Sequence, residues 1–360
     1  MFRRARQLHV ASSLFRYPAA VPSRHYSFEV FRDVPPLRKL RRDLLLSKRT
    51  VGLVPTMGAL HDGHLSLIRQ AASENTDVFV SIFVNPTQFG VNEDLSSYPR
   101  TWDADVAKLE QLNNELNGDG NGRITAILAP TAKTMYPTLP PSSEIDGDGS
   151  FVTITPIAKK LEGASRPVFF RGVATVCMKL FNIVSAERVY FGQKDVQQTV
   201  VIRRMVKDFH LDTEVKIGPT MREADGLAMS SRNVYLGARR RNVGLVLFSA
   251  LRAAESAYQS GKLARNDILG PANEIARDVL TKQQSLSPSE RANFEVDYIS
   301  LADPDTLEEM ETVDPAKGAI LSGAIKMAPL ETTNAGEDCG LGDGKVAVRL
   351  IDNLILQPVS

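Results

Sequence analysis

Residues 54–64 read VPTMGALHDGH, and they decide the fold that this sequence predicts. The stretch joins the end of an apolar run to the start of an amphipathic segment, and its junction contains Gly58 and Gly63. The first backbone N–H groups of a helix have no partner within the helix, and the helix dipole adds to their attraction for phosphate. A strand, a glycine loop and a helix start in succession therefore predict an anion site.

Short apolar runs alternate with amphipathic stretches from residue 51 to about residue 218. This alternation is typical of a parallel sheet covered by helices. We expect strands at residues 51–54, 78–84, 124–128, 188–191 and 213–217. Helices are expected to begin near Gly63, Asp103, Gly172 and Asp195, where apolar residues recur every three or four positions. The predicted fold class for residues 31–218 is α/β, a doubly wound, Rossmann-like parallel sheet.

The pair Gly218-Pro219 ends the last of these strands, and Gly and Pro together interrupt regular structure strongly. We therefore place a hinge there and expect a smaller α+β domain at residues 219–360, which would act as a lid. Its helices are expected at residues 241–259 and 266–283, and its strands at 294–301, 319–321 and 346–350. Segments rich in Gly, Asp, Asn, Ser or Pro are expected to be surface insertions, at residues 113–122, 138–150 and 328–344.

The overall composition excludes several classes of protein. With 43 basic and 42 acidic residues, the chain lacks the broad positive field of a protein that holds nucleic acid by its phosphates. Its two cysteines, Cys177 and Cys339, give neither a disulfide framework nor a metal-binding spacing, which is typical of a reducing compartment. No apolar run approaches the roughly 20 residues that span a bilayer. We expect neither a nucleic-acid nor a membrane partner.

The first residues differ in composition from the rest of the chain. Residues 1–26 contain several serines and no acidic residue, and their arginines are Arg3, Arg4, Arg6, Arg16 and Arg24. This composition is typical of a mitochondrial presequence, so we expect residues 1–30 to be a targeting segment. The alternative is a disordered basic extension without a targeting role, on a cytoplasmic protein.

His61 and His64 have the most specific chemistry at the first helix start. They are three residues apart, so one helical turn places both rings on the same side. An isolated histidine is more often an ordinary packed or surface residue, but two of the five histidines in the chain occur here. A metal site is the weaker alternative, because no third Cys, His or carboxylate stands at ligand spacing.

Two further segments place cations where a phosphate would stabilise them. Lys194 precedes an expected helix, and its charge opposes the helix dipole unless an anion is bound. Ser230, Ser231 and Arg232 lie just beyond the hinge, where two hydroxyls and a guanidinium form a phosphate clamp that is able to close. The alternatives are a solvated lysine and serines that serve as turn or cap residues.

Residues 55–64 resemble the HIGH-type loop of nucleotidylyltransferases, and the longer stretch is similar to that of pantothenate synthetases. Further blocks resemble the same family in the same order: SIFVNPTQFG at residues 81–90, LEGASRP and GVATV within residues 161–176, FGQKDVQQ at residues 191–198 and MREADGLAMSSRN at residues 221–233. The resemblance extends over residues 36–325 and 346–356. One position departs from it, because Phe169 stands where family members often have histidine, and no polar role is transferred there.

The resemblance implies an enzyme that binds ATP, pantoate and β-alanine. It implies that Gln88 and Gln198 contact pantoate, that Asn85 lies on the β-alanine side and that Arg166 holds a carboxylate. Its implied ATP contacts are Met57, Gly58, His61, Gly63, His64, Gly192, Lys194, Asp195, Met221, Met229, Ser230, Ser231 and Arg232.

The resemblance also implies a mechanism, in which the pantoate carboxylate attacks the α-phosphorus of ATP and the β-alanine amine then displaces AMP from pantoyl adenylate. The expected catalytic residues are His61, His64, Lys194 and Arg232, which would stabilise charge on the phosphates, with His64 as proton donor. Mg²⁺ is expected to accompany ATP, held mainly by phosphates and water because no dedicated carboxylate cage is apparent. A homodimer is expected.

Two alternative functions remain open at this point. The first is another adenylate-forming ligase or nucleotidylyltransferase with a HIGH motif, although an aminoacyl-tRNA synthetase would need a basic RNA-binding domain that is not evident. The second is a nucleotide-binding homologue without catalytic activity. The four expected catalytic residues argue against this second alternative.

Overall fold

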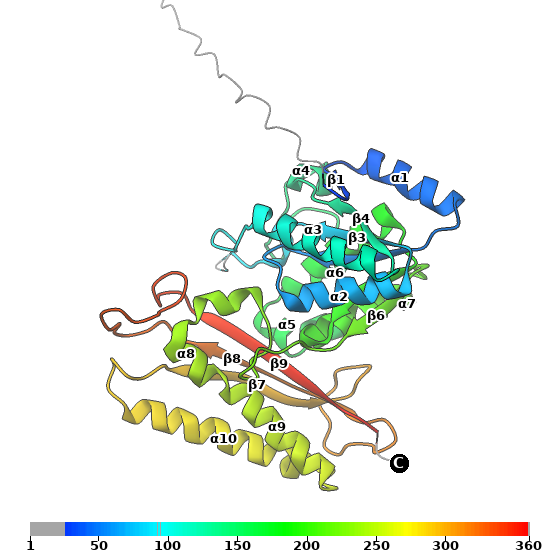
Figure 1. Ribbon diagram of the computed structural model, residues 1–360. Helices are drawn as coiled ribbons and strands as arrows, with labels where there is room; N and C mark the ends of the chain where they lie inside the picture. The colour runs from blue at the N-terminus through cyan, green and yellow to red at the C-terminus, as the bar shows by residue number, and fades with distance from the viewer. Residues whose placement is uncertain (1–25, 92, 94, 359–360) are drawn as a thin grey trace, which may run out of the picture.

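The computed structural model describes residues 26–91, 93 and 95–358. Within these residues the strands form a six-stranded parallel sheet and a three-stranded antiparallel sheet. Figure 1 shows the two sheets in separate bodies, with the long strands of the smaller sheet lying beneath the larger body. The fold class predicted from the sequence is confirmed.

The larger sheet has the strand order β1-β4-β3-β2-β5-β6. Its strands are β1 (Glu29–Phe31), β2 (Val51–Thr56), β3 (Asp77–Ile82), β4 (Arg123–Leu128), β5 (Arg188–Gly192) and β6 (Glu214–Gly218). The sequence pattern predicted all of them except β1, which is a three-residue edge strand and too short to show a period. The central strands β2 and β3 are buried along most of their length, as a sheet covered on both faces requires.

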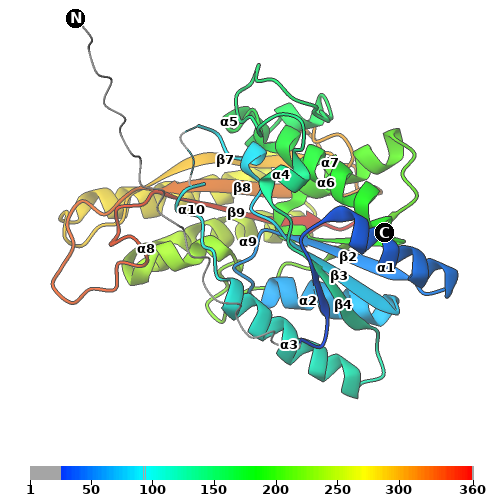
Figure 2. The same cartoon turned by 90° about the horizontal axis from the view of Figure 1, so that it is seen from above.

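Helices cover both faces of this sheet. On one face lie α1 (Val34–Leu46), α6 (Phe169–Val184) and α7 (Val196–Asp208). On the other lie α2 (Asp62–Glu74) and α3 (Trp102–Gly118), and Figure 2 shows the sheet between the two helical layers. The short helices α4 (Ala132–Met135) and α5 (Glu162–Ser165) belong to the connections. The sequence pattern did not predict α1, whose first turn contains prolines, where proline is tolerated.

The chain order of the strands reverses direction at β2. From β2 the chain continues to β3 and β4 on one side, whereas β5 and β6 lie on the other side. In such a sheet the loops at the carboxyl ends of the two strands at the reversal diverge and leave a crevice for a ligand. The crevice here lies between the loop after β2 and the 3₁₀ turn η3 (Gln193–Asp195) after β5. The topology therefore brings His61 and Lys194 to the same place.

The smaller sheet and its helices form a second core. The sheet order is β7 (Phe294–Ala302), β8 (Ala319–Met327) and β9 (Val348–Leu356), and the helices are α8 (Gly237–Gly244), α9 (Val246–Gln259) and α10 (Arg265–Ser285). The helix predicted at residues 241–259 is two helices, and the break follows Gly244, which Leu350 of β9 approaches closely. Ile355 of β9 packs against the core of the larger sheet, so the two bodies share an apolar contact.

Two of the predicted surface insertions have more structure than expected. Residues 113–118 continue α3, and buried Asn113 exchanges hydrogen bonds with the backbone of Ile124, so an insertion at residues 113–122 was wrong over that part. Residues 328–344 form turns, but the segment packs on α8: the Ala238 N–H donates to the carbonyl oxygen of Asp338 (3.0 Å). The polar composition of these two segments gave no indication of their tertiary contacts.

Candidate active site

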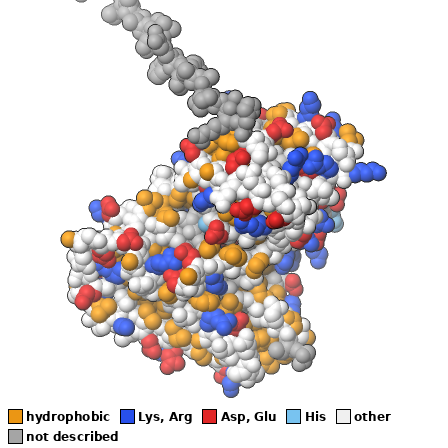
Figure 3. Space-filling view, viewed as in Figure 1, with side chains coloured by type: hydrophobic (Ala, Val, Ile, Leu, Met, Phe, Trp, Pro, Cys, Tyr) orange, Lys and Arg blue, Asp and Glu red, His pale blue; other side chains and the backbone are white. Residues whose placement is uncertain are grey.

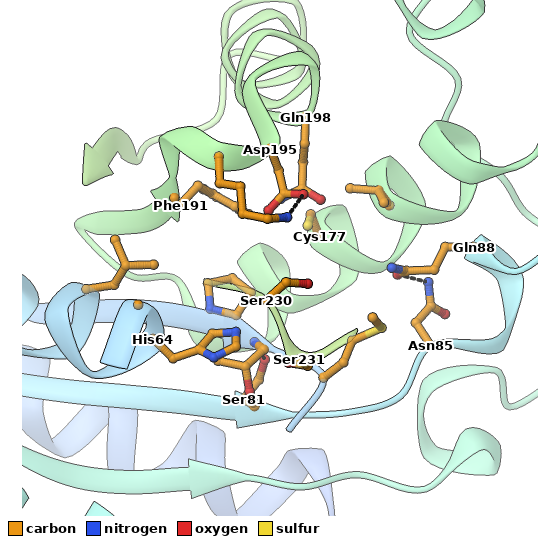
Figure 4. A pocket seen from close by; sticks show the side chains of 18 of the residues that line it. His64, Ser81, Asn85, Gln88, Cys177, Phe191, Asp195, Gln198, Ser230 and Ser231 are labelled. Atoms are coloured by element: carbon orange, nitrogen blue, oxygen red, sulfur yellow. Dashed lines mark hydrogen bonds and ion pairs between the residues drawn. The ribbon is translucent and has the colours of Figure 1, made fainter. Parts of the chain in front are cut away.

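One cavity at the carboxyl ends of β2 and β5 contains every site residue expected from the sequence except Gly58. Its walls come from the loop after β2, the end of β3, helix α6, the turn η3 with α7, and residues 219–232. Figure 4 shows His64, Ser230 and Ser231 on one side of the cavity, Asp195 and Gln198 opposite, and Asn85 with Gln88 at one end. Segments far apart in the sequence thus meet in one place.

Gly58 is not among the residues that line the cavity, and its expected contact with ATP stays a prediction. Its φ of +83° belongs to a region that L-residues rarely adopt, and an added Cβ would lie 3.1 Å from Oδ2 of Asp105. The residue therefore allows the chain to turn between β2 and α2.

His61 is the N-cap of α2 and binds the helix start with its side chain. Its Nδ1 accepts a hydrogen bond from the Gly63 N–H (3.1 Å), and Nδ1 of His64 accepts one from the His61 N–H (3.4 Å). A Cβ at residue 63 would lie 2.8 Å from the His61 ring, so glycine leaves room for this cap. Because Nδ1 is the acceptor in both rings, the neutral imidazoles carry their proton on Nε2.

The surroundings of both imidazoles disfavour their protonated form. Burial, with the nearby positive charges of Lys194 and Lys108, lowers the pKa of His61 to about 4. The pKa of His64 is lowered to about 3, first by burial, then by His61 and the same lysines. The negative charges of Asp195 and Asp62 oppose the shift at His61 only in part. The Nε2–H of His64 is a hydrogen-bond donor in the neutral state, and the role of His64 as proton donor stays a prediction.

The histidine loop is held from α3 by two residues that the sequence pattern did not reveal. Buried Asp105 accepts hydrogen bonds from the N–H groups of Ala59 (2.9 Å) and Leu60 (2.8 Å). Lys108 donates to the carbonyl oxygen of Leu60. In the sequence these two residues resemble the solvated face of an amphipathic helix, so only their tertiary contacts identify them.

Lys194 lies opposite the histidines, in the turn η3 between β5 and α7. Its side chain is 19% exposed, and Nζ lies 3.8 Å from Oδ1 of Asp195, longer than a hydrogen bond. The ammonium group is therefore held beside a helix start with only a loose carboxylate partner. Such a cation is stabilised by an anion in the cavity.

The segment from Met221 to Arg232 covers the same cavity from the side of the smaller body. The Met229 N–H donates to the carbonyl oxygen of Met221 (2.9 Å), which closes a small loop, and Ser231 Oγ donates to the carbonyl oxygen of Ala59 (3.0 Å). This last bond joins the segment to the histidine loop. Ser230 caps the following 3₁₀ turn through the Arg232 N–H (3.3 Å), so it fits the cap alternative as well as the cavity wall.

An amide pair lies at the other end of the cavity. Asn85 donates to Oε1 of Gln88 (3.0 Å) and to the carbonyl oxygen of Gly172 (3.2 Å), while its own oxygen accepts from the Tyr136 hydroxyl (2.6 Å). Because Oε1 of Gln88 is an acceptor for Asn85, the amide NH₂ of Gln88 is the group available to a ligand. Asn85 is 1% exposed and orients Gln88.

Arg166 reaches the cavity wall with its charge already balanced. It donates to both carboxylate oxygens of Glu93 (2.8 and 2.5 Å) and to Glu162 (2.9 Å). The guanidinium lies 3.8 Å from the ring centroid of Phe169, which occupies the position where histidine was noted as common. Arg166 thus holds two protein carboxylates in this structure, and its expected contact with a substrate carboxylate stays a prediction.

Apolar side chains complete this end of the cavity. They include Phe89, Val173, Val176 and Leu180, together with Cys177. Burial raises the pKa of the Cys177 thiol to about 12, so it packs as a small apolar group and not as a thiolate. A compartment with apolar walls and the amides of Gln88 and Gln198 suits a small branched molecule with polar ends.

The described residues contain neither a group of three metal-ligating side chains nor a helix long and apolar enough to cross a bilayer. On the face shown in Figure 3, Lys and Arg are interspersed with Asp and Glu.

The parallel sheet, the histidine pair at its strand-order reversal, and the lysine and Ser-Ser-Arg segments around the same cavity define a nucleotide-binding α/β enzyme with a HIGH-type loop. Comparison with known proteins specifies it further. The family model described as Pantoate-beta-alanine ligase matches residues 29–355. The chain belongs to this family of ligases.

Relatives and solved structures agree with this assignment. A pantothenate synthetase of Roseiflexus sp. (strain RS-1) is 45% identical over 310 residues, which are 86% of this chain and 99% of that protein. One from Thermodesulfovibrio yellowstonii is 40% identical over 329 residues, 91% of this chain and 100% of that protein. The crystal structure of the pantothenate synthetase from Thermus thermophilus has a TM-score of 0.71 and 35% identity, and the match covers 92% of this chain and 100% of that chain.

A further solved structure is described as a complex. It is the pantoate-beta-alanine ligase from Francisella tularensis with beta-gamma ATP and beta-alanine. Its TM-score is 0.63 at 28% identity, over 91% of this chain and 98% of that chain.

The comparisons overturn the expected mitochondrial localisation. The relatives come from bacteria such as Roseiflexus and Thermodesulfovibrio, which have no mitochondria. Most of the expected targeting segment, residues 1–25, lies outside the described residues. An arginine- and serine-rich start is a compositional signal of low specificity, which explains the error.

Proposed function

We propose that the protein condenses pantoate with β-alanine in two steps at this cavity, using ATP. A pantoate carboxylate oxygen attacks the α-phosphorus, and the bond from that phosphorus to the bridging oxygen of pyrophosphate breaks. The β-alanine amine then attacks the acyl carbon of pantoyl adenylate. The bond from that carbon to the oxygen on the α-phosphorus breaks, and AMP leaves with this former carboxylate oxygen. One observation carries the proposal. The side chains expected to contact phosphate, those of His61, His64, Lys194 and Arg232, line the same cavity as a compartment with apolar walls and two amides.

The histidine loop and the lysine turn would stabilise the first step. The Nε2–H groups of His61 and His64 are free of the backbone caps that occupy Nδ1, and Lys194 adds a positive charge from across the cavity. Arg232 completes the set from the smaller body. Donors and charges that are fixed before the reaction stabilise developing charge without further reorganisation.

The amides would orient pantoate, with the Gln88 NH₂ as donor and Gln198 from α7 as its partner. The apolar walls then receive the branched carbon of the substrate. Mg²⁺ is proposed as the counter-ion of ATP, held by phosphates and water, because the described cavity offers single carboxylates such as Asp195 and no cluster of them. It supplies charge neutralisation on the phosphates.

Two further proposals rest on the sequence and the family resemblance. We propose that residues 31–218 and 219–360 are two domains with a hinge at Gly218-Pro219. An apolar cluster formed wholly within the second part supports this division, and Ala302, Leu307 and Ile320 join the cluster of the first part where the two pack together. We also propose a homodimer. Light scattering coupled to gel filtration measures its mass, and a monomer at micromolar concentration would refute the dimer.

The decisive test of the mechanism is isotope exchange. Labelled pyrophosphate should exchange into ATP when pantoate is present and β-alanine is absent, because the adenylate forms first. Oxygen-18 in the pantoate carboxylate should appear in AMP after complete turnover. His64→Ala should suppress the exchange, and His64→Asn, which retains an acceptor for the cap, controls for folding. Label in free phosphate together with ADP would overturn the adenylate route.

A further inference from the structure

We propose that Asn353, in the middle of β9, is a positioning residue that holds Lys194 in place for the phosphates of ATP. This inference rests on the proposed function of Lys194. Asn353 belongs to the smaller body and does not line the cavity. It acts through the backbone of the turn η3.

The side-chain hydrogen bonds of Asn353 are all with that turn. Its Nδ2 donates to the carbonyl oxygens of Gln193 (2.9 Å) and Lys194 (2.9 Å), and its Oδ1 accepts from Nε2 of Gln193 (3.2 Å). The side chain is fully buried at 0% exposure. Both donor hydrogens and the acceptor of the amide are therefore used on two consecutive residues, one of which is Lys194.

The alternation of β9 explains why this residue faces the larger body. Successive side chains of a strand point to opposite faces. Leu350 and Leu356 pack in the core of the smaller body. On the alternate positions, Ile355 packs in the core of the larger sheet and Arg349 donates to Glu162 of α5. Asn353 belongs to this second set, so it presents its amide to η3.

Asp352, which precedes Asn353 in β9, binds the segment that contains Arg232. Asp352 accepts two hydrogen bonds from Arg222 (2.6 and 2.9 Å), and Arg222 also lies over the ring of Phe248 from α9 (3.9 Å). Arg222 begins the loop that ends at Arg232. One strand therefore supports the Ser-Ser-Arg segment with Asp352 and the Lys194 turn with the next residue, Asn353.

The chemistry of an amide is specific for this position. A carboxylate has the same shape but only acceptors, so Asn353→Asp would place a negative oxygen against two carbonyl oxygens. Asn353→Leu would leave two carbonyls and the Gln193 amide without their partner in a buried place. Either change should displace η3, and small displacements of a charged group from the reacting atoms reduce turnover strongly.

A double-mutant cycle tests the proposal. Its readouts are pyrophosphate–ATP exchange with pantoate, together with kcat and the KM values for ATP and pantoate. Its variants are Asn353→Leu, Lys194→Ala and the combination of the two. We expect Asn353→Leu to reduce the exchange rate by about tenfold or more while the KM for pantoate changes less than about twofold. In the Lys194→Ala background the same change should have almost no further effect, because the group that it positions is absent.

A matched control separates positioning from general loss of stability. Asn113→Asp alters another fully buried amide, which links α3 to β4, and it should lower the midpoint of thermal unfolding without a comparable loss of exchange. Asn353→Asp supplies a second variant in case Asn353→Leu does not fold.

Two outcomes would overturn the inference. One is a normal exchange rate in folded Asn353 variants. The other is an equal loss of exchange rate on Asn353→Leu in the wild-type and Lys194→Ala backgrounds, which would indicate a structural role. If Lys194→Ala alone leaves exchange intact, the proposed function of Lys194 fails instead, so the two failures are distinguishable.

Discussion

His61 and His64 bind the start of α2 with one nitrogen of each ring and keep the other nitrogen for the ligand proposed above. Nδ1 accepts a backbone N–H in each ring, and Nε2 remains for the cavity. The cap fixes the tautomer, and the low pKa values keep each ring a neutral donor with a single proton. The proposed phosphate site would need no protonated histidine, because Lys194 would supply charge from the opposite wall.

The pKa shift at His64 gives a pH dependence of stability with a definite sign. Its pKa is about 3 in the folded protein and ordinarily 6.5, so between these values the unfolded chain binds more protons. Stability therefore falls as pH falls through 6.5 toward 3. We expect the wild type to lose about 1–2 kcal/mol more unfolding free energy than His64→Gln between pH 7 and pH 5.

Urea unfolding at the two pH values measures this difference. His210→Asn, at an exposed residue, controls for the removal of a histidine. Equal losses in the wild type and His64→Gln would mean that the imidazole is not desolvated, and the neutral-donor interpretation would then fail.

Among the larger elements, the segment at residues 328–344 shows how a polar stretch contributes to stability. Arg239 of α8 pairs with Glu337, and fully buried Arg240 donates to the carbonyl oxygen of Cys339 (3.4 Å). Arg240 also donates to the carbonyl oxygens of Leu236 and Val346, which lie outside the segment, whereas Nε and Nη2 of Arg239 donate to Glu337. The segment has little apolar area, yet removing it would take from the Arg239 side chain, which is 12% exposed, its carboxylate partner.

We predict that replacing residues 331–341 with a short turn lowers the midpoint of thermal unfolding while exchange activity per folded molecule is retained. The reason is that the segment contacts α8 and does not line the cavity. Leu341→Ser, at a side chain 54% exposed, is the matched control and should change neither property. Unchanged thermal stability of the shortened protein would show that these acceptors are dispensable, as composition alone had indicated.

At the scale of the whole molecule, a chain of charges crosses from the smaller sheet to the substrate end of the cavity. Arg349 of β9 donates to Asp297 of β7 (2.8 Å) and to Glu162 of α5 (2.7 Å), and Glu162 in turn accepts from Arg166 (2.9 Å). The side chains of Glu162 and Asp297 are each 9% exposed. The position of the smaller body is thereby connected to Arg166, whose guanidinium lies over the Phe169 ring.

We predict that Arg349→Met lowers the unfolding free energy by about 2 kcal/mol and raises the KM for pantoate more than the KM for ATP. Removing one partner of a buried ion pair leaves the other charge without compensation. Glu162 would then have Arg166 as its remaining cationic partner, and we expect this change to displace the Arg166 side chain. Chemical denaturation and initial rates measure the two effects. Arg291→Met, whose partner Glu331 is exposed, should cause a smaller change. Equal effects of the two variants would show that the network does not extend to the substrate end.

The sequence by itself determined the class of fold and most of the cavity. The apolar period of strands and helices, and the glycines at residues 58 and 63, follow from local preferences that act within a few residues. For that reason five of the six strands of the larger sheet and the histidine, lysine and serine segments were predictable from the sequence.

Only the tertiary structure decided which side chains support those segments. Asp105, Tyr136 and Asn353 touch the site's loops from elements far away in sequence, and nothing in their own neighbourhoods distinguishes them from ordinary helix, turn or strand residues. The same holds for Arg166, whose partners Glu93 and Glu162 decide that its charge is balanced within the protein. Local sequence sets how each segment folds, whereas the packing of distant segments sets each side chain's partners, burial and pKa.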